Sequence, residues 1–384
     1  MLIQIHLLQN YAPANLNRDD TGSPKDAMFG GYRRGRISSQ CLKRSLRKSA
    51  AFAEAFEQAG LLGVRTKKLY DLLRAELVAM SVDDDTLHSI LARVSEIGRE
   101  SSKRAAVEEE AEGEAAETEI EAEVETKQLI FLGKSELRPM AEKLLALYKE
   151  HGANKWADSK KLKIADITKA LGKSLPCSVD IAMFGRMTTS EAFEDVAASV
   201  QVAHALSTNA LMQEFDYYTA VDDLSGESGA GMIGDIEFNS STYYKYLNVH
   251  WEQLVENLGD DVAVARQAVL ALIEAAATAQ PSGKQNSFAA HSLPDLVLVQ
   301  VSDKNLPVSL ANAFVKPVRA STDKSLMDVA EERLADYLER VSKVYGLDGR
   351  LAFVALQDCA LPKAQRLPSL HDLKSWLDQQ LPEA

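Results

Sequence analysis

The sequence predicts an α+β fold in which a ferredoxin-like sheet carries a helical insertion. Alternating or continuous apolar runs predict strands at 2–9, 177–184, 200–206, 235–249 and 296–301. Apolar residues at helical spacing predict helices at 38–60 and 261–279. With the insertions set aside, the order is a strand, a helix, consecutive strands, a helix and a strand, which is the split βαβ or ferredoxin-like arrangement. Many RNA-binding domains use this sheet, and so do many unrelated enzymes, so the fold alone decides no function.

The first 60 residues combine a strand, a long connection and a helix. The connection, 10–37, is rich in Asn, Asp, Gly and Arg, and a connection of that length without regular structure tends to be functional. Ser38 offers a helix N-cap, and Gly60 ends the helix. Within it, basic residues recur at i,i+4 spacing, which costs stability unless an anion neutralises them. This helix therefore presents a candidate functional face.

The remaining elements follow in order along the chain. A helical insertion at 61–176 contains helical patterns at 67–80, 83–99, 135–150 and 155–171. The segment 207–234 is irregular and is expected to form an ordered aromatic tip on a Gly/Ser-rich stalk. Beyond the strand at 296–301, the C-terminal part is expected to add helices at 309–316, 325–345 and 369–379 and a strand at 351–357.

Length and composition exclude several classes of protein. The 384 residues suggest two or three structural units, and 46% hydrophobic with 26% charged residues is ordinary for a soluble globular chain. No stretch approaches the roughly 20 apolar residues of a membrane span, and the N-terminus does not have the pattern of a signal peptide. The cysteines Cys41, Cys177 and Cys359 are too far apart for a disulfide framework or a metal knuckle, which predicts a cytoplasmic location.

The net charge of −13 is unevenly distributed. Segment 105–126 carries ten glutamates and no Lys or Arg, so it accounts for all but three of these net negative charges. It is expected to be a solubilising loop. Residues 33–48, in contrast, hold seven basic residues and no acid. That basic segment is compatible with a nucleic-acid partner or with a solvated helix face.

No motif indicates catalysis, a cofactor or a metal site. The sequence lacks a Walker loop, GxGxxG, GxSxG and HExxH, and its seven histidines never pair at metal spacing. His204 falls in a strand pattern and is expected to be structural. The acidic pairs at 19–20 and 222–223 could bind a divalent metal, but capping a turn or neutralising local Arg is favoured.

With no catalytic motif in the sequence, the remaining candidates are side chains that could bind a nucleic acid. A helix N-terminus beside Lys and Arg suits phosphate binding. Met187, after Gly185 and Arg186, could wedge against a base or pack in a core. Tyr217 and Tyr218 could stack on a base or pack on the sheet.

Blocks along almost the whole chain resemble the backbone subunit of the type I-E CRISPR Cascade complex, the CasC family of the RAMP superfamily. The N-terminal blocks are LNRDD at 16–20, KDAMFGG at 25–31 and RRGRISSQCLKR at 33–44. The central blocks are VDIAMFGRM at 179–187, QVAHA at 201–205 and FDYYTAVDDL at 215–224. GKQ at 283–285, ANAF at 311–314 and YGL at 345–347 complete the set. The acidic run at 105–126 departs from the family pattern.

The resemblance implies a hand-like molecule. An RRM-like palm would comprise 1–60, 177–206 and 235–384, with helical fingers at 61–176 and a thumb hairpin at 207–234. Several copies would stack head-to-tail along one CRISPR RNA, kink it at regular intervals and leave the segments between kinks free to pair with target DNA. The protein would be non-catalytic and would need no cofactor. Its partners would be the RNA, target DNA, its own copies, and the large, small, guide-capping and guide-processing subunits of the complex, with no membrane.

The resemblance also assigns residues. Contacts with the RNA backbone are expected from Arg18, Lys25, Arg36, Ser38, Gln40, Lys43, Arg44, Arg47, Lys284 and Gln285. The RNA kink is expected at Gly185, Arg186, Met187 and Thr188, with Phe215, Tyr217, Tyr218 and Thr219 as the intruding thumb. Lysines of the fingers, Lys155, Lys160, Lys161 and Lys163, are candidates for target DNA.

Two alternatives belong to other classes of protein. Related backbone subunits of other CRISPR types cut target RNA with an Asp in the loop after the first strand, and Asp19, Asp20 and Asp26 occupy that loop here. The chain could therefore be a metal-assisted ribonuclease. It could also be a helical assembly protein that binds no RNA.

Overall fold

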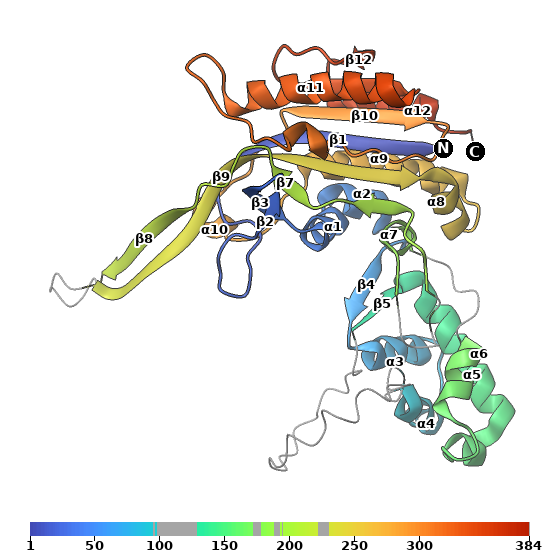
Figure 1. The fold of residues 1–384 in the computed structure, drawn as a ribbon. Helices are drawn as coiled ribbons and strands as arrows, with labels where there is room; N and C mark the ends of the chain where they lie inside the picture. Colours follow the sequence, from blue (N-terminus) through green and yellow to red (C-terminus); the bar gives the residue numbers. More distant parts are fainter. Residues whose placement is uncertain are drawn as a thin grey trace. The chain divides into compact units, whose positions relative to one another are not determined.

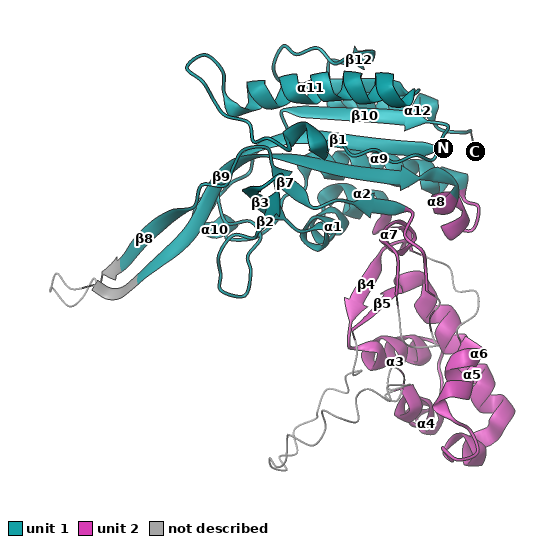
Figure 2. Cartoon of the chain, viewed as in Figure 1, with its two compact units in different colours: residues 1–55, 200–252, 262–384 teal, residues 56–199, 253–261 magenta. Residues whose placement is uncertain are grey.

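The computed structural model describes residues 1–94, 97, 129–171, 178–187, 193, 195–221 and 230–383. These residues divide into two compact units (Figure 2). Unit 1 comprises Met1–Ala55, Val200–Glu252 and Val262–Ala384, and unit 2 comprises Phe56–Ser199 and Gln253–Asp261. The acidic run at 105–126 lies outside the described residues. In the part of the chain that is described, no helix is both long and apolar enough to cross a bilayer.

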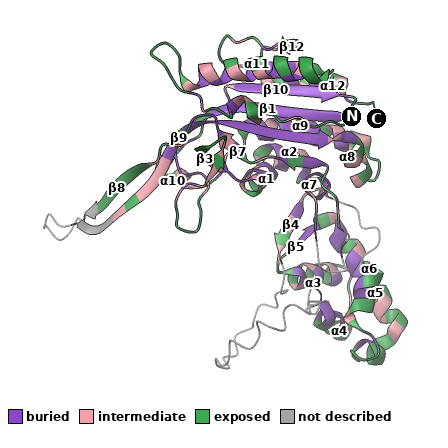
Figure 3. Cartoon of the chain, viewed as in Figure 1, coloured by how far each residue is buried: buried purple, intermediate pink, exposed green. Residues whose placement is uncertain are grey.

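Unit 1 is built on one large, mixed sheet, so the predicted α+β class is correct (Figure 1). Its strand order is β12-β11-β10-β1-β9-β7-β3-β2. The bounds are β1 Leu2–Ala14, β2 Asp26–Phe29, β3 Tyr32–Ile37, β7 Ala205–Ser207, β9 Ala230–His250, β10 Leu296–Ser302, β11 Arg350–Ala355 and β12 Ala364–Arg366. The short β6 (Val200–Val202) and β8 (Glu214–Val221) pair with β9 away from this path. Strand β1 pairs antiparallel with both β9 and β10, and Figure 3 shows these central strands as largely buried.

Helices cover both faces of this sheet. On one face, α11 (Leu326–Tyr345) and the 3₁₀ helix η2 (Ala311–Phe314) pack through Leu334 and Phe314 on Leu8 and Leu298 of the strands. Helix α9 (Val262–Thr278) contacts α12 (Leu370–Gln380) and α1 (Ser39–Arg47) on the other face. The short helices α2 (Ala50–Phe56) and α10 (Gln285–Phe288) complete the helices of unit 1, and most of α8 (Trp251–Asn257) belongs to unit 2.

Unit 2 is mainly helical, with one two-stranded sheet of β4 (Gly63–Thr66) and β5 (Ile130–Gly133). Its helices are α3 (Leu69–Ala79), α4 (Asp84–Val94), α5 (Lys134–Trp156), α6 (Ile164–Leu171) and α7 (Val179–Phe184). Leu73, Ile90, Leu144 and Trp156 are fully or almost fully buried in its core. The Trp156 indole N–H donates to Ser89 O at 2.8 Å, which satisfies its polar edge inside that core.

Several predicted elements were wrong. Within the segment predicted as a strand at 177–184, Val179–Phe184 forms the buried helix α7, because a short and mostly apolar segment cannot be assigned to helix or strand by periodicity. The connection at 10–37 contains the hairpin β2–β3, whose turn residues Gly30 and Gly31 both have positive φ. The helix at 38–60 is two helices, because the Ser49 hydroxyl accepts from Phe52 N–H and starts α2. The pattern at 155–171 is split between the end of α5 and α6, and 309–316 is only the short η2.

Candidate nucleic-acid interface

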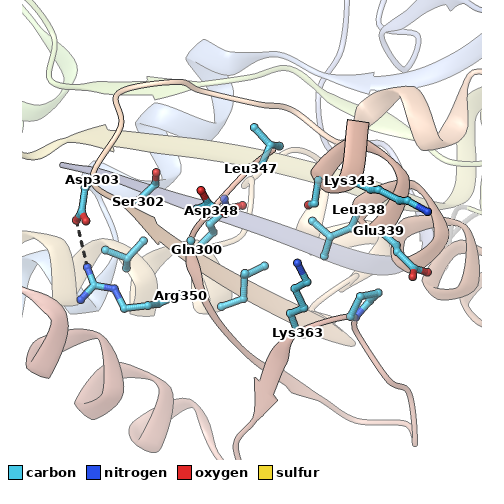
Figure 4. Close-up of a pocket in the computed structure, with 15 residues that line it drawn as sticks. Gln300, Ser302, Asp303, Leu338, Glu339, Lys343, Leu347, Asp348, Arg350 and Lys363 are labelled. Carbon is cyan, nitrogen blue, oxygen red and sulfur yellow. Dashed lines mark ion pairs between the residues drawn. The ribbon is translucent and has the colours of Figure 1, made fainter. Parts of the chain in front are cut away.

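Two cavities of unit 1 differ in their charge. The first, of about 730 Å³, lies where β10 and α11 end (Figure 4). Its charged lining side chains are Asp303, Glu339, Lys343, Asp348, Arg350 and Lys363. Three acids therefore face three bases, and Arg350 pairs with Asp303 at 3.5 Å. A balanced lining gives no net field that would attract a polyanion.

The second cavity is an open groove of about 1030 Å³, formed by the loop after β1, the helix α1 and the chain after α9. We call it the basic groove and define it by its lining residues Leu16, Asn17, Arg18, Asp19, Asp20, Gly22, Cys41, Arg44, Ser45, Lys48, Ser49, Ala50, Thr278, Ala279, Gln280, Ser282, Gly283 and His291. Arg18, Arg44 and Lys48 are exposed in it. Cationic and hydroxyl side chains around an open groove suit the phosphates of a nucleic-acid strand.

The two acids of the groove differ in their surroundings. Asp19 Oδ1 accepts from Thr21 N–H, Thr21 Oγ1 and Ser23 N–H at 2.8–3.0 Å. These hydrogen bonds, led by the Thr21 hydroxyl, lower the pKa of Asp19, so it remains ionised and fixes the loop. Asp20 is exposed, and Asp26 forms an ion pair with Arg33 outside the groove. Among the described residues, no three His, Cys, Asp or Glu side chains gather as a metal cluster would require.

Helix α1 is held on this loop by its first residues. Ser38 N–H donates to Asn17 Oδ1 at 2.8 Å, and the Ser38 hydroxyl accepts from Cys41 N–H at 3.3 Å. Ser38 is only 6% exposed, so its hydroxyl serves as the helix cap rather than as a solvent-facing contact. Beyond the cap, Gln40 is exposed and Lys43 is half-buried.

A second group of cations flanks the groove. Arg36 donates through Nε to Asp26 O at 3.0 Å, and one of its terminal nitrogens lies 3.3 Å from His204 Nδ1. Partial burial, with Arg36 and Lys25 nearby, lowers the pKa of His204. His204 was expected to have a structural role because it falls in a strand pattern. Its side chain is instead exposed to solvent. An anion bound here would offset the repulsion between the protonated His204 ring and the two cations Arg36 and Lys25, and would therefore favour the protonated ring.

The loop that carries Lys284 and Gln285 lies directly on the backbone of the groove. A Cβ built on Gly283 would stand 2.2 Å from Leu16 O, so only glycine permits this close approach. Lys284 has a left-handed backbone, with φ of 49°, and the Gln285 side-chain amide donates to Pro281 O at 3.0 Å. Both side chains are half-buried.

A buried polar network lies behind the groove. Lys245 Nζ donates to Gln9 Oε1 and to the Tyr11 hydroxyl, and Tyr11 in turn donates to Gln280 Oε1 at 2.7 Å. Burial lowers the pKa of Lys245 to about 7. Gln280 lines the groove, so this network connects the groove to the centre of the sheet.

Two of the seven basic residues at 33–48 do not face solvent. Arg34 is fully buried and donates to the carbonyls of Ser207, Thr208 and Phe314 at 2.6–2.9 Å. It therefore joins β3 to the end of β7 and to the end of η2. Arg47 is 8% exposed. Arg47 was expected among the residues that contact the RNA backbone, and its burial removes it from the solvent-facing cations.

The predicted aromatic tip is a hairpin of β8 and the first part of β9. Pairing runs from Glu214 opposite Phe238 to Val221 opposite Ala230. Phe215 and Tyr217 are 61% and 65% exposed and share one face with the exposed Thr219. The Tyr218 ring covers Gly234 on the partner strand, since a Cβ there would meet the hydroxyl at 2.6 Å.

In unit 2, α7 ends at Gly185, and the next two residues have opposite environments. Arg186 is 7% exposed, and its guanidinium binds both carboxylate oxygens of Glu136 at 2.8 Å. Met187 is 94% exposed. Arg186 was expected to contact the RNA kink, but its charged group is committed to Glu136. Thr188 lies outside the described residues.

The structure thus gathers Arg18, Arg44, Gly283 and their neighbours on one groove of unit 1. The lysines expected at target DNA are Lys155, Lys160, Lys161 and Lys163. All four are exposed in unit 2, where Lys161 pairs with Asp158 at 3.3 Å. Sequence reasoning missed His291 and Gln280 as groove residues, and it placed Lys48 on the candidate functional face without naming it as an RNA contact. The i,i+4 spacing of Arg44 and Lys48 was the one signal that could have added Lys48.

The fold and the groove define an α+β chain with an open groove that is lined by cationic and hydroxyl side chains. A chain of the solved structure "CRISPR RNA-guided surveillance complex, pre-nicking" is similar, with a TM-score of 0.77, 29% identity and coverage of 99% of this chain and 100% of that one. A chain of "CRISPR RNA-guided surveillance complex" has the same fold, with a TM-score of 0.61, 24% identity and 99% coverage of both. The model of the CT1975-like protein family matches residues 3–379, so the chain belongs to that family. No curated protein matches the chain.

Proposed function

We propose that this chain is a non-catalytic backbone subunit of a type I-E Cascade complex, a CasC protein with an RRM-like palm. It binds CRISPR RNA in the basic groove, stacks head-to-tail with its own copies and supports pairing of the guide with target DNA. The complex acts in the cytoplasm with large, small, guide-capping and guide-processing subunits. The similarity to a chain of an RNA-guided surveillance complex over its whole length supports this proposal.

The basic groove is the observation that carries the proposal. Its exposed cations come from two separate segments that line the same groove. Arg18 lies in the loop after β1, whereas Arg44 and Lys48 lie in and just after α1. Lys25 and Arg36 extend the positive surface beside it. A single strand held by such cations keeps its bases free, which a guide requires in order to pair.

The exposed aromatic hairpin supports the proposed kinking of the RNA. Phe215 and Tyr217 lie on one face of β8 with more than half of each side chain in solvent. Exposed aromatic rings on a hairpin stack on or prop splayed bases, whatever the base identity. In the assembled filament the hairpin of one copy presses on the RNA held by the next copy.

The geometry of the loop acids favours a scaffold over a metal-assisted ribonuclease. Asp19 is committed to Thr21 and Ser23, and Asp26 to Arg33, so Asp20 is the remaining candidate in this loop. Asp20→Ala should leave RNA binding unchanged. A Mg²⁺-dependent RNA cleavage activity that Asp20→Ala abolishes would favour the ribonuclease instead.

The test of the proposed function is to purify the chain with its proposed partner subunits and a CRISPR array. The 260/280 nm absorbance ratio and a urea gel of the phenol extract then report any bound RNA. We expect a discrete RNA of uniform length. Particles that contain no nucleic acid at low salt, or filaments that survive ribonuclease unchanged, would refute the RNA-scaffold function and favour an RNA-free assembly protein.

A further inference from the structure

His204 is an exposed histidine whose ring lies beside two cations of the surface that flanks the basic groove. We propose that His204 completes a phosphate site with Lys25 and Arg36 and takes up a proton when RNA binds there. RNA binding by this chain then strengthens as the pH falls. The proposal rests on the proposed function, because its ligand is a phosphate of the bound RNA. It adds a residue and a pH response that the proposed function does not itself require.

The two cations belong to a surface that is continuous with the basic groove. Lys25 and Arg36 line a small pocket that shares Leu16 and Asn17 with the groove. Lys25 N–H donates to Asn17 O at 2.8 Å, and Arg36 N–H donates to Lys25 O at 2.9 Å, so the backbone holds both residues beside the groove. The positive surface therefore extends from the groove to these two side chains.

Strand pairing brings His204 to the same place. His204 directly precedes β7, whose Leu206 lies opposite Arg36 of β3. The Arg36 side chain donates through Nε to Asp26 O at 3.0 Å, and its Nη1 lies 3.3 Å from His204 Nδ1. The contact with the main chain holds the guanidinium, so its Nη1 stays directed at the imidazole ring.

This approach of two nitrogen atoms defines the charge of the ring in the free protein. A guanidinium has only donors, so His204 Nδ1 accepts the hydrogen bond from Arg36. The ring is then neutral and carries its proton on Nε2. A second proton, on Nδ1, would place two N–H groups and two positive charges against each other.

The charged groups around His204 oppose its protonation in the free protein. Partial burial, Arg36 and Lys25 together lower the pKa of the ring. The Asp26 carboxylate, which follows Lys25 in the chain, forms its ion pair with Arg33 instead. The neutral ring that the hydrogen-bond geometry requires is therefore also the form that the local charges favour.

Strand β9 lies beside the segment that carries His204, and two of its side chains titrate. Tyr246 O accepts from Ala203 N–H at 3.0 Å, and burial raises the pKa of the Tyr246 hydroxyl to about 12, so this side chain stays neutral where a histidine titrates. Lys245, whose pKa burial lowers to about 7, belongs to the network behind the groove. Any effect of Lys245 on RNA binding is separated from that of His204 by substituting His204 alone.

A phosphate at this surface reverses the balance. Its oxygens accept hydrogen bonds from both side chains, so His204 can donate to the phosphate instead of accepting from Arg36. The negative charge also offsets the repulsion between a protonated ring and the two cations. Bound RNA therefore raises the pKa of His204, and a proton is taken up on binding. By linkage, the affinity rises as the pH falls from the pKa of the ring in the complex towards its pKa in the free protein.

The experiment measures the affinity of the full chain for a single-stranded oligouridylate from about pH 5.5 to pH 8, the range in which histidine titrates and uracil does not. Isothermal titration calorimetry in two buffers of different ionisation enthalpy counts the protons taken up. The variants are His204→Gln, which cannot become charged, and His204→Lys, which is charged over the whole range. His371→Gln, which removes an exposed histidine of α12, is the matched control. Thermal unfolding checks that each variant is folded.

We expect the gain in affinity from the highest to the lowest pH to be about three- to tenfold smaller in His204→Gln than in the unmodified protein, since one unit of pKa shift on binding corresponds to a tenfold change in affinity. His204→Lys should bind more tightly than the unmodified protein at the highest pH and equally at the lowest. Protonated His204 adds one phosphate contact, so the salt slope of the unmodified protein should exceed that of His204→Gln by about 0.7 at the lowest pH. His371→Gln should match the unmodified protein throughout.

Equal gains in affinity at low pH, and equal proton uptake, in His204→Gln and the unmodified protein would overturn the role of His204. Proton uptake that His204→Gln loses without any change in the salt slope would mean that the ring senses the RNA without contacting it, which would overturn the phosphate site. In both cases the proposed function stands, since the RNA is still bound. Absence of RNA binding by the unmodified protein at every pH would instead refute the proposed function and this inference with it.

Discussion

Replacing one cation of the basic groove should change the salt dependence of RNA binding by a calculable amount. The solvent-facing cations in and beside the groove are Arg18, Lys25, Arg36, Lys43, Arg44 and Lys48. If each neutralises one phosphate of a single strand, log K falls with log salt with a slope of about 4, at roughly 0.7 per contact. A fourfold rise in salt then weakens binding about 300-fold. Arg44→Ala removes one contact, so the slope should fall to about 3.5 and the loss to about 130-fold.

The assay is fluorescence anisotropy of a labelled single-stranded RNA titrated at salt concentrations from about 50 to 200 mM, the range in which such slopes are measured. Lys343→Ala is the matched control. The substitution also removes one positive charge from unit 1, but Lys343 lines the cavity of balanced charge and not the basic groove. Its slope should equal that of the unmodified protein. An Arg44→Ala slope equal to that of the control, or a change in base preference, would refute the assignment of Arg44 to a phosphate.

Three further predictions concern the described structure. Arg34→Met should lower the free energy of unfolding by about 3 kcal/mol in urea titrations, since buried carbonyls lose charged donors, whereas the exposed Arg33→Ala should cost under about 1 kcal/mol. Gly283→Ala should weaken RNA binding with little change in melting temperature, because the added Cβ must displace the loop from Leu16 O; unchanged affinity would mean that this contact does not shape the groove. The pKa of Lys245 falls to about 7 in the folded state, so between about pH 7 and pH 10 the unfolded chain holds a proton on Lys245 that the folded chain has lost. The free energy of unfolding should therefore rise with pH over this range. Lys245→Met should abolish that rise in melting temperature, and an identical pH profile in both proteins would contradict the lowered pKa.

The elements that the sequence predicted well are those with strong periodicity. The continuous apolar run at 296–301 is the central strand β10, and the helix expected at 325–345 is α11, from Leu326 to Tyr345. Strand β3 was missed because Arg33, Arg34 and Arg36 interrupt the apolar alternation, and β2 was missed with it because β3 is its pairing partner. The buried carbonyls that bind Arg34 come from segments about 170 and 280 residues away, so no local pattern could reveal a strand there.

Charge predicted the location of the candidate site better than the orientation of each side chain. The basic segment at 33–48 does border the groove, through Arg44 and Lys48. The density of positive charge in this segment could not distinguish these exposed cations from Arg47, which is buried. Which side chains of α1 turn towards the core depends on how α1 packs against α9. Glu136 was missed for a similar reason, since it lies 50 residues from its partner Arg186.

Strand β9 runs without interruption from the centre of the sheet into the aromatic hairpin. Its last 12 residues, Asn239–His250, pair with β1 through a register that extends from Ala14 to Leu2, while its first nine pair with β8. At about 3.4 Å per residue, the hairpin projects roughly 30 Å beyond the sheet. Because one strand forms both parts, a force along the hairpin passes directly into the sheet, where it is borne as shear across the hydrogen bonds between β9 and β1. Strands resist shear along their length far better than peeling, because all the bonds must break together, so the hairpin can press on a neighbour without unravelling the core from which it grows.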